Sequence, residues 1–194
     1  RVSNANDSPN DINFVVRRSL DAGRSWEPAS TVIDCPGSGE DASSVIDSCM
    51  VQDPHTGRVH VLIDHFPGGI GQPNCWASTG FDEQGRRLLR DLDDARYVVD
   101  PDGAVTTIEG QDTEFRVMDD GTVLRDGNPA GNIELAPGAD PAESLLAIPT
   151  SYLQIAHSDD DGVTWSKPRD LNPQLKQPWM RFLGTCPGNG IALR

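Results

Sequence analysis

The chain has 194 residues, a formal net charge of −14 and an apolar fraction of 36%, with 19 glycines and 15 prolines. The acidic balance argues against a nucleic-acid partner, because phosphate binding depends on clustered Lys and Arg, and no basic cluster here exceeds pairs such as Arg17-Arg18. It does not exclude an anionic ligand, since a few buried arginines can dominate a pocket. No apolar run approaches the ~20 residues of a membrane-spanning helix.

Short strands separated by turns are predicted over the first part of the chain. Residues 1–10 are polar and predict a loop, and residues 12–18 predict a strand of β-branched and aromatic residues. Residues 44–50 and 59–64 predict a strand pair, because the Asp-Pro and Gly between them suit a hairpin turn. Residues 66–74 predict an extended irregular loop.

The middle of the chain changes to small units that end in Asp-Gly turns, at residues 82–85, 100–103 and 119–121. The stretches between these turns, such as residues 96–99 and 113–118, alternate or cluster as strands do. Residues 152–156 predict one further strand, and residues 141–146 and 171–176 predict at most one or two helical turns. The predicted fold class is all-β.

The four cysteines are too widely spaced for a metal site. They lack a C-x-x-C pair, and no histidine lies at zinc-ligand spacing, so we expect neither a metal nor a cofactor. Two alternatives stay open for them, either two disulfides of undetermined pairing or four thiols. The residues are Cys35, Cys49, Cys75 and Cys186.

Two eight-residue turns share one pattern, at residues 19–26 and 158–165. In each, a Ser begins the turn, an Asp two positions later can bond backbone amides, a Gly allows positive φ, and a Trp is expected to anchor the turn to the core. Asp21 and Asp160 are therefore interpreted as structural. A calcium loop is the less favoured alternative, because alternating ligands and a distal Glu are missing.

These turns resemble the Asp boxes of sialidase propellers. The order of several further stretches is similar to that of bacterial secreted exo-α-sialidases: Arg17-Arg18-Ser19, Ile46-Asp47-Ser48, Phe66-Pro67, Gly131-Asn132-Ile133 and Trp179-Met180-x-Phe182-Leu183-Gly184. The resemblance implies part of a six-bladed β-propeller with a small inserted β-rich domain. The two turns lie about 140 residues apart, whereas one blade needs only ~40–50, which also indicates an insertion.

The resemblance divides the chain into three parts. Residues 1–74 correspond to the first propeller blades, residues 75–149 to the inserted domain, and residues 150–194 to the continuation of the propeller. It implies an enzyme that releases terminal sialic acid from glycoconjugates with retention, through a Tyr nucleophile, a Glu that activates it, an arginine triad and an Asp general acid/base. Sialylated glycans would be its partners, and a secreted or cell-surface bacterial location would follow.

Carried over to this sequence, the resemblance assigns the general acid/base to Asp7, with Asp11 as second choice. It assigns substrate binding to Asp47, which faces the amide and hydroxyl groups of the sugar; an unpaired carboxylate within an apolar strand is otherwise costly. Phe66 and Ile70 are candidates for the apolar pocket of the N-acetyl group, and core packing is their alternative role.

The family's Phe/Tyr-Arg-Ile-Pro motif is missing from this sequence, and neither Tyr97 nor Tyr152 matches its nucleophile. The first arginine is expected before Arg1, and the other two arginines, the Tyr and its Glu after Arg194. We therefore expect a part of a longer sialidase that is inactive alone and held to the remaining propeller. The alternative is a noncatalytic Asp-box propeller that binds carbohydrate or protein.

Overall fold

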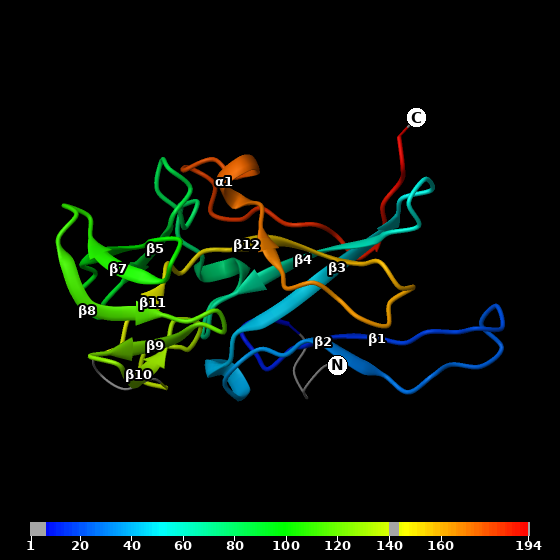
Figure 1. The fold of residues 1–194 in the computed structure, drawn as a ribbon, viewed down its shortest axis with the longest axis horizontal. Helices are drawn as coiled ribbons and strands as arrows, with labels where there is room; N and C mark the ends of the chain where they lie inside the picture. The colour runs from blue at the N-terminus through cyan, green and yellow to red at the C-terminus, as the bar shows by residue number, and fades with distance from the viewer. Residues whose placement is uncertain (1–6, 140–143, 194) are drawn as a thin grey trace.

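The computed structural model describes residues 7–139 and 144–193. Nearly all regular structure in these residues is β, as the sequence predicted. Figure 1 shows two larger sheets side by side, with a two-stranded hairpin below one of them. The hairpin pairs β1 (Phe14–Val16) with β2 (Ser30–Ile33) in antiparallel register.

A five-stranded sheet forms the centre of the molecule, in the order β13-β12-β4-β3-β14. Its long strands are β3 (Ser44–Gln52), β4 (Val59–Phe66) and β12 (Tyr152–Ser158), which pair antiparallel. The edges are β13 (Arg169–Asp170) and β14 (Gly188–Asn189), and β14 pairs parallel to β3. The β3–β4 hairpin confirms the strand pair that the sequence predicted.

A seven-stranded sheet, in the order β10-β9-β8-β7-β6-β5-β11, occupies one end of the molecule. Its first six strands follow one another along the chain, and tight turns such as those ending at Gly85, Gly103 and Gly121 connect the surrounding segments. The strands are β5 (Arg87–Arg90), β6 (Arg96–Val99), β7 (Ala104–Thr107), β8 (Asp112–Val117), β9 (Thr122–Arg125), β10 (Asn128–Asn132) and β11 (Leu146–Ala147).

In the part of the chain that the structure describes, three short helical turns complete the fold: η1 (Gly39–Asp41), η2 (Gln72–Asn74) and α1 (Asn172–Leu175). The last one confirms the helical turn predicted near residues 171–176. The other predicted turn, at residues 141–146, begins outside the described residues, and Leu146 belongs to β11. Among the described residues, no helix is long and apolar enough to cross a membrane.

Each of the two larger sheets has its own core. Val45, Val61, Ile63 and Ala156 lie in the core of the five-stranded sheet, and a second cluster including Leu89, Val105 and Val123 fills the seven-stranded sheet. All four cysteines are free thiols, so the structure favours the second of the two alternatives left open by the sequence. Burial raises the pKa of Cys35 to about 12 and that of Cys75 to about 11, which keeps both thiols protonated.

Both predicted Ser-x-Asp turns form the same hydrogen bonds. Asp21 accepts bonds from the backbone and hydroxyl of Ser25, and Asp160 does the same with Thr164. These bonds lower the pKa of each aspartate to about 2, led by the hydroxyl in both cases. The predicted role of Asp21 and Asp160 in shaping the turn agrees with this geometry.

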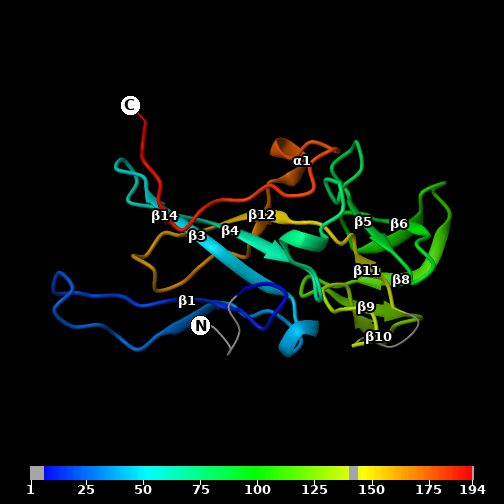
Figure 2. The same ribbon diagram turned by 180° about the vertical axis from the view of Figure 1, so that it is seen from behind.

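The tryptophans of the two turns differ, contrary to the prediction that each anchors its turn to the core. Trp165 packs edge-on against Phe14, with ring centroids 6.3 Å apart. Trp26 is 58% exposed. The first turn projects away from the larger sheets at the tip of the β1–β2 hairpin, and Figure 2 shows the same arrangement from behind. Among the described residues, Trp165 therefore has a core to pack on and Trp26 has none.

Candidate active site

The segment that carries Asp7 is held against the start of β3. The Ser8 hydroxyl lies 2.7 Å from the Ser44 hydroxyl, and Ile12 forms a parallel β-bridge to Ser44. Gly71 of the irregular loop packs so closely on this segment that a Cβ would lie 2.4 Å from the Ser8 carbonyl oxygen. Asp7 itself is exposed, and its Oδ1 accepts a hydrogen bond from the Ser8 amide at 2.7 Å.

Asp47 lies at an irregular point in the middle of β3. The pairing of β3 with β4 shifts between Ile46 and Cys49, and Asp47 has a φ of 52° in the left-handed region. A non-glycine residue in this conformation is uncommon and takes its place only where neighbouring contacts hold it. Desolvation, and after it the negative charge of Asp7, raise the pKa of Asp47. The two predicted carboxylates therefore interact electrostatically.

The two apolar candidates occupy different environments. Phe66, at the end of β4, is fully buried, and its ring stacks on Phe182 with centroids 6.2 Å apart and planes 3° from parallel. Its position agrees with core packing, the alternative role. Ile70 is half-buried in a turn closed by its amide and the Pro67 carbonyl. Asp11, the second choice for the acid, accepts a hydrogen bond from the Asn13 side chain.

Two further residues lie against Asp47 that sequence reasoning missed. Thr185 donates from its hydroxyl to the Asp47 carbonyl at 2.6 Å and from its amide to Asp64 Oδ1 at 2.9 Å. Asp64 is a fully buried carboxylate within the apolar strand β4. Its presence in an apolar stretch was a usable signal, as it was for Asp47. Nothing near Thr185 in the sequence indicated its partners.

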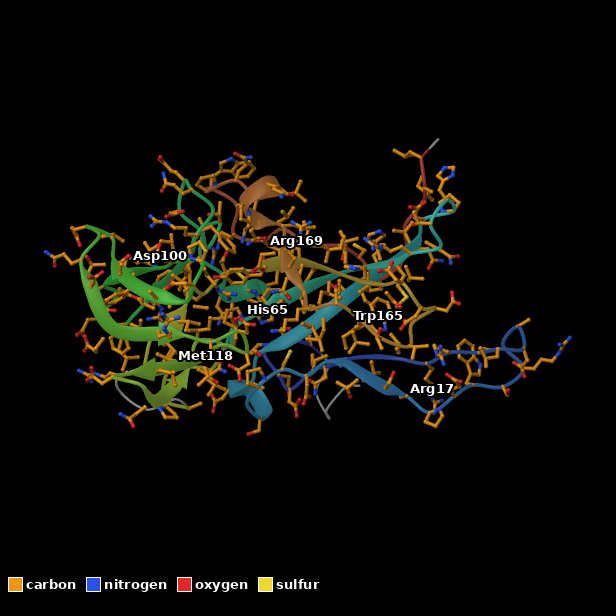
Figure 3. The ribbon with its side chains drawn as sticks, viewed as in Figure 1. Arg17, His65, Asp100, Met118, Trp165 and Arg169 are labelled. Carbon is orange, nitrogen blue, oxygen red and sulfur yellow. The ribbon has the colours of Figure 1, made fainter. Side chains whose placement is uncertain are left out.

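A separate ionic cluster lies where the two larger sheets meet. Arg87 of β5 contacts Glu134 at 2.8 Å and Asp170 of β13 at 3.6 Å, and its guanidinium lies 4.6 Å from the centre of the Tyr152 ring. Burial alone would lower the pKa of Arg87, but Glu134, Tyr152 and Asp170 outweigh it and raise that pKa. His65 Nε2 lies 3.3 Å from Glu134, and Figure 3 places His65 between the sheets.

This cluster forms part of a groove of about 940 Å³ between the seven-stranded sheet, β2 and β13. Its lining mixes both charges and includes His65, Arg87, Glu134, Gln154, Lys167 and Asp170, but neither Asp7 nor Asp47. Burial lowers the pKa of His65 despite the neighbouring Glu134. The groove is therefore distinct from the predicted catalytic side of the molecule. Within the described ranges, no group of three or more His, Cys, Asp or Glu could hold a metal ion.

Known sialidases share both sequence and fold with this chain. Anhydrosialidase of Macrobdella decora is 28% identical over 98% of this chain and 31% of its own length, and Sialidase B of Streptococcus pneumoniae serotype 4 is 26% identical over 100% and 34%. The solved structure of the leech intramolecular trans-sialidase with 2,7-anhydro-Neu5Ac has a TM-score of 0.81 at 24% identity, covering 96% of this chain and 34% of that one. No family model matches.

The S. pneumoniae NanB sialidase structure gives the same TM-score, 0.81, at 24% identity, and covers 97% of this chain and 35% of that one. The fold is thus that of the β-propeller sialidases. The sequence relatives, at 26–28% identity, are likewise named sialidase or anhydrosialidase. The chain spans about a third of the length of the curated relatives it matches.

Proposed function

We propose that the chain is part of an exo-α-sialidase that releases terminal sialic acid from glycoconjugates, and that it contributes the general acid side of the active site. The observation that carries the proposal is the packing of the segment that contains Asp7 against the start of the strand that contains Asp47. These residues come from separate segments, and the charge of Asp7 contributes to raising the pKa of Asp47. The Ser8–Ser44 contact holds the two segments together.

In this proposal Asp7 protonates the leaving oxygen and later activates water, while Asp47 binds the polar groups of the sugar. Exposure of Asp7 suits this role, because a general acid must reach the substrate. The tyrosine nucleophile, its Glu and the arginine triad belong to parts of the protein beyond this chain. Residues 75–149 are proposed as an inserted domain, the two Ser-x-Asp turns as Asp boxes, and the location as secreted or cell-surface bacterial.

The test replaces Asp7 with Ala in the complete protein and compares two substrates. Loss of a general acid lowers the rate about 10²- to 10⁴-fold on sialyl-lactose, which has a poor leaving group. The loss is smaller on an aryl sialoside, whose leaving group needs less protonation. Asp112→Ala, at an exposed position of β8, is the matched control. Equal turnover of wild type and Asp7→Ala on sialyl-lactose would exclude Asp7 as the acid.

Intramolecular transfer is a second candidate reaction, because one relative is named an anhydrosialidase and a structural neighbour an intramolecular trans-sialidase. In such a reaction a hydroxyl of the sugar replaces water, so the product is lighter than sialic acid by one water molecule. Mass spectrometry of the product in ¹⁸O-water separates the two reactions, since only hydrolysis incorporates the label. A protein that cleaves no sialoside at all would instead favour a noncatalytic carbohydrate-binding or protein-binding propeller.

A further inference from the structure

Asp64 is a carboxylate with no access to solvent. It lies on β4, its relative exposure is 0%, and its Oδ1 accepts the Thr185 amide at 2.9 Å. Its Oδ2 is also buried and has no hydrogen-bond partner among the described residues. Buried polar atoms in native proteins are nearly always bonded, so an unpartnered carboxylate oxygen calls for a specific explanation.

Thr185 connects this buried carboxylate to Asp47. The Thr185 hydroxyl donates to the Asp47 carbonyl at 2.6 Å, at the residue whose φ is 52°. Left-handed backbone is uncommon at a non-glycine residue, and surrounding contacts must hold it. Thr185 supplies such a contact, and its own position is fixed by the bond from its amide to Asp64.

The segment before Thr185 is packed tightly against the same place. A Cβ on Gly184 would lie 2.0 Å from Asp64 Oδ2 and 2.5 Å from the Phe182 ring. The Phe182 ring stacks on Phe66, and the Leu183 amide donates to the Ser151 hydroxyl at 3.0 Å. These contacts fix the position of residues 182–184, and they thereby place Thr185 against Asp47.

We propose that Asp64 and Thr185 are positioning residues for Asp47, and that together they hold the irregular turn of β3 that presents Asp47 to the substrate. The inference rests on the proposed function, because Asp47 is the proposed sugar-binding residue. Neither Asp64 nor Thr185 touches substrate in this scheme. They act through the backbone of Asp47.

The charge of Asp64 matters as well as its geometry. Desolvation raises the pKa of Asp64 to about 7, the Thr185 amide opposes this effect, and the charge of Asp47 adds to it. The charged group that acts on Asp64 is Asp47 on β3. Its pairing neighbours are Ile46 on β3 and Leu153 on β12, and residues 182–185 are uncharged. Below about pH 7 Asp64 is neutral, and above it a third negative charge faces a site for an anionic sugar.

The first test compares Thr185→Val with Thr185→Ser in the complete protein on sialyl-lactose. Valine keeps the shape but removes the hydroxyl that holds the Asp47 carbonyl, and we expect kcat/KM to fall about tenfold, mainly through KM. Serine retains the donor and restores most of the loss. Thr56→Val, at an exposed turn, is the matched control for a lost threonine hydroxyl. A KM for Thr185→Val equal to that of the wild type overturns the inference.

The second test is the pH profile of Asp64→Asn, which keeps the size of the side chain and the acceptor for the Thr185 amide. The folded pKa of Asp64 is raised, so its proton is lost as the pH rises through about 7. We expect wild-type kcat/KM to decline through that range and Asp64→Asn to lose that decline. An unchanged alkaline decline in Asp64→Asn would contradict the electrostatic part.

A third readout separates failure of this inference from failure of the proposed function. The ¹³Cα chemical shift of Asp47 reports its φ without any substrate. Thr185→Val should move this shift away from its wild-type value, and Thr185→Ser should not. If the Asp47 shift of Thr185→Val equals that of the wild type, the inference is overturned, whether or not the protein cleaves sialosides. If the shift differs but the wild-type protein cleaves no sialoside, only the proposed function is overturned.

Discussion

At the scale of single residues, the two Ser-x-Asp turns have the same internal hydrogen bonds but differ in how their tryptophans pack on the rest of the molecule. Asp160 shapes a turn whose Trp165 packs on Phe14, and Asp21 shapes a turn whose Trp26 is largely exposed. Each carboxylate has its pKa lowered to about 2 by the hydroxyl and amide it accepts from. Local bonding is therefore the same, and only the connection to the rest of the molecule differs.

We predict that Asp160→Ala lowers the thermal midpoint more than Asp21→Ala, because loss of the second turn also frees Trp165. A lowered folded pKa stabilises the protein above the unfolded pKa, and this stabilisation disappears as the pH falls from about 4 towards 2. The difference between wild type and each variant should shrink over that range. Calorimetry at pH 7, 4 and 2.5 measures both effects, and equal midpoints for the two variants would refute the role of Trp165.

At the scale of elements, the segment of residues 182–185 packs against β3 and β4 without forming a strand. A Cβ built on Gly184 would clash with Asp64 Oδ2 at 2.0 Å, whereas the nearest atom to a Cβ built on Gly188 is 4.0 Å away. Both glycines lie in the same C-terminal stretch, and neither has a positive φ. An alanine substitution at each of the two glycines therefore compares a closely packed site with an open one, without a difference in the need for positive φ.

We predict that Gly184→Ala destabilises the protein by about 1–3 kcal/mol, the usual cost of forcing a methyl group into a filled site. Gly188→Ala should change the free energy of unfolding by less than about 0.5 kcal/mol. Urea unfolding of both variants measures this difference. Similar small losses for the two would mean that the segment is not packed on Asp64.

Much of this level of structure was predictable from sequence. The β3–β4 hairpin was predicted from the Asp-Pro and Gly of its turn, and the β-rich character of the seven-stranded sheet was predicted from short strand-like stretches closed by glycine turns. The parallel pairing of β14 with β3 and the shift at Asp47 were not. Both depend on a segment more than a hundred residues away in sequence, and local patterns contain no information about it.

At the scale of the whole molecule, one partly buried arginine joins the two larger sheets. Arg87 comes from the seven-stranded sheet, while Asp170 and Tyr152 come from the five-stranded sheet. Its side chain is 18% exposed, in contrast to the exposed pair formed by Arg58 and Asp159 on the surface. Removal of one partner from a buried ionic cluster leaves the other charges unpaired.

We predict that Arg87→Met lowers the free energy of unfolding by about 3–5 kcal/mol, whereas Arg58→Met lowers it by less than about 1 kcal/mol. Arginine and methionine have side chains of similar length. The two variants therefore compare the loss of ion pairing at a partly buried site with the same loss at the surface. Chemical denaturation followed by circular dichroism measures both. A loss for Arg87→Met as small as that for Arg58→Met would show that the sheets are held by apolar contacts alone.

The candidate site was predictable to a smaller extent than the fold. Asp7 and Asp47 came from resemblance to a family, and their identity as site residues remains a prediction. Asp64 and Thr185 lie 121 positions apart, and only the folded chain brings them together. The packing of Phe66 on Phe182 has the same origin. Spacing and residue type could not have indicated these contacts.

The seven-stranded sheet leaves and re-enters the rest of the chain at adjacent points. The Trp76 amide bonds the Pro149 carbonyl at 2.7 Å, and the Thr150 hydroxyl bonds the Trp76 carbonyl at 2.8 Å. If residues 75–149 are the inserted domain proposed above, we predict that they can be removed or exchanged in the laboratory with a very short splice. A chain shortened in this way would still have to neutralise Asp170, which loses Arg87 together with the module.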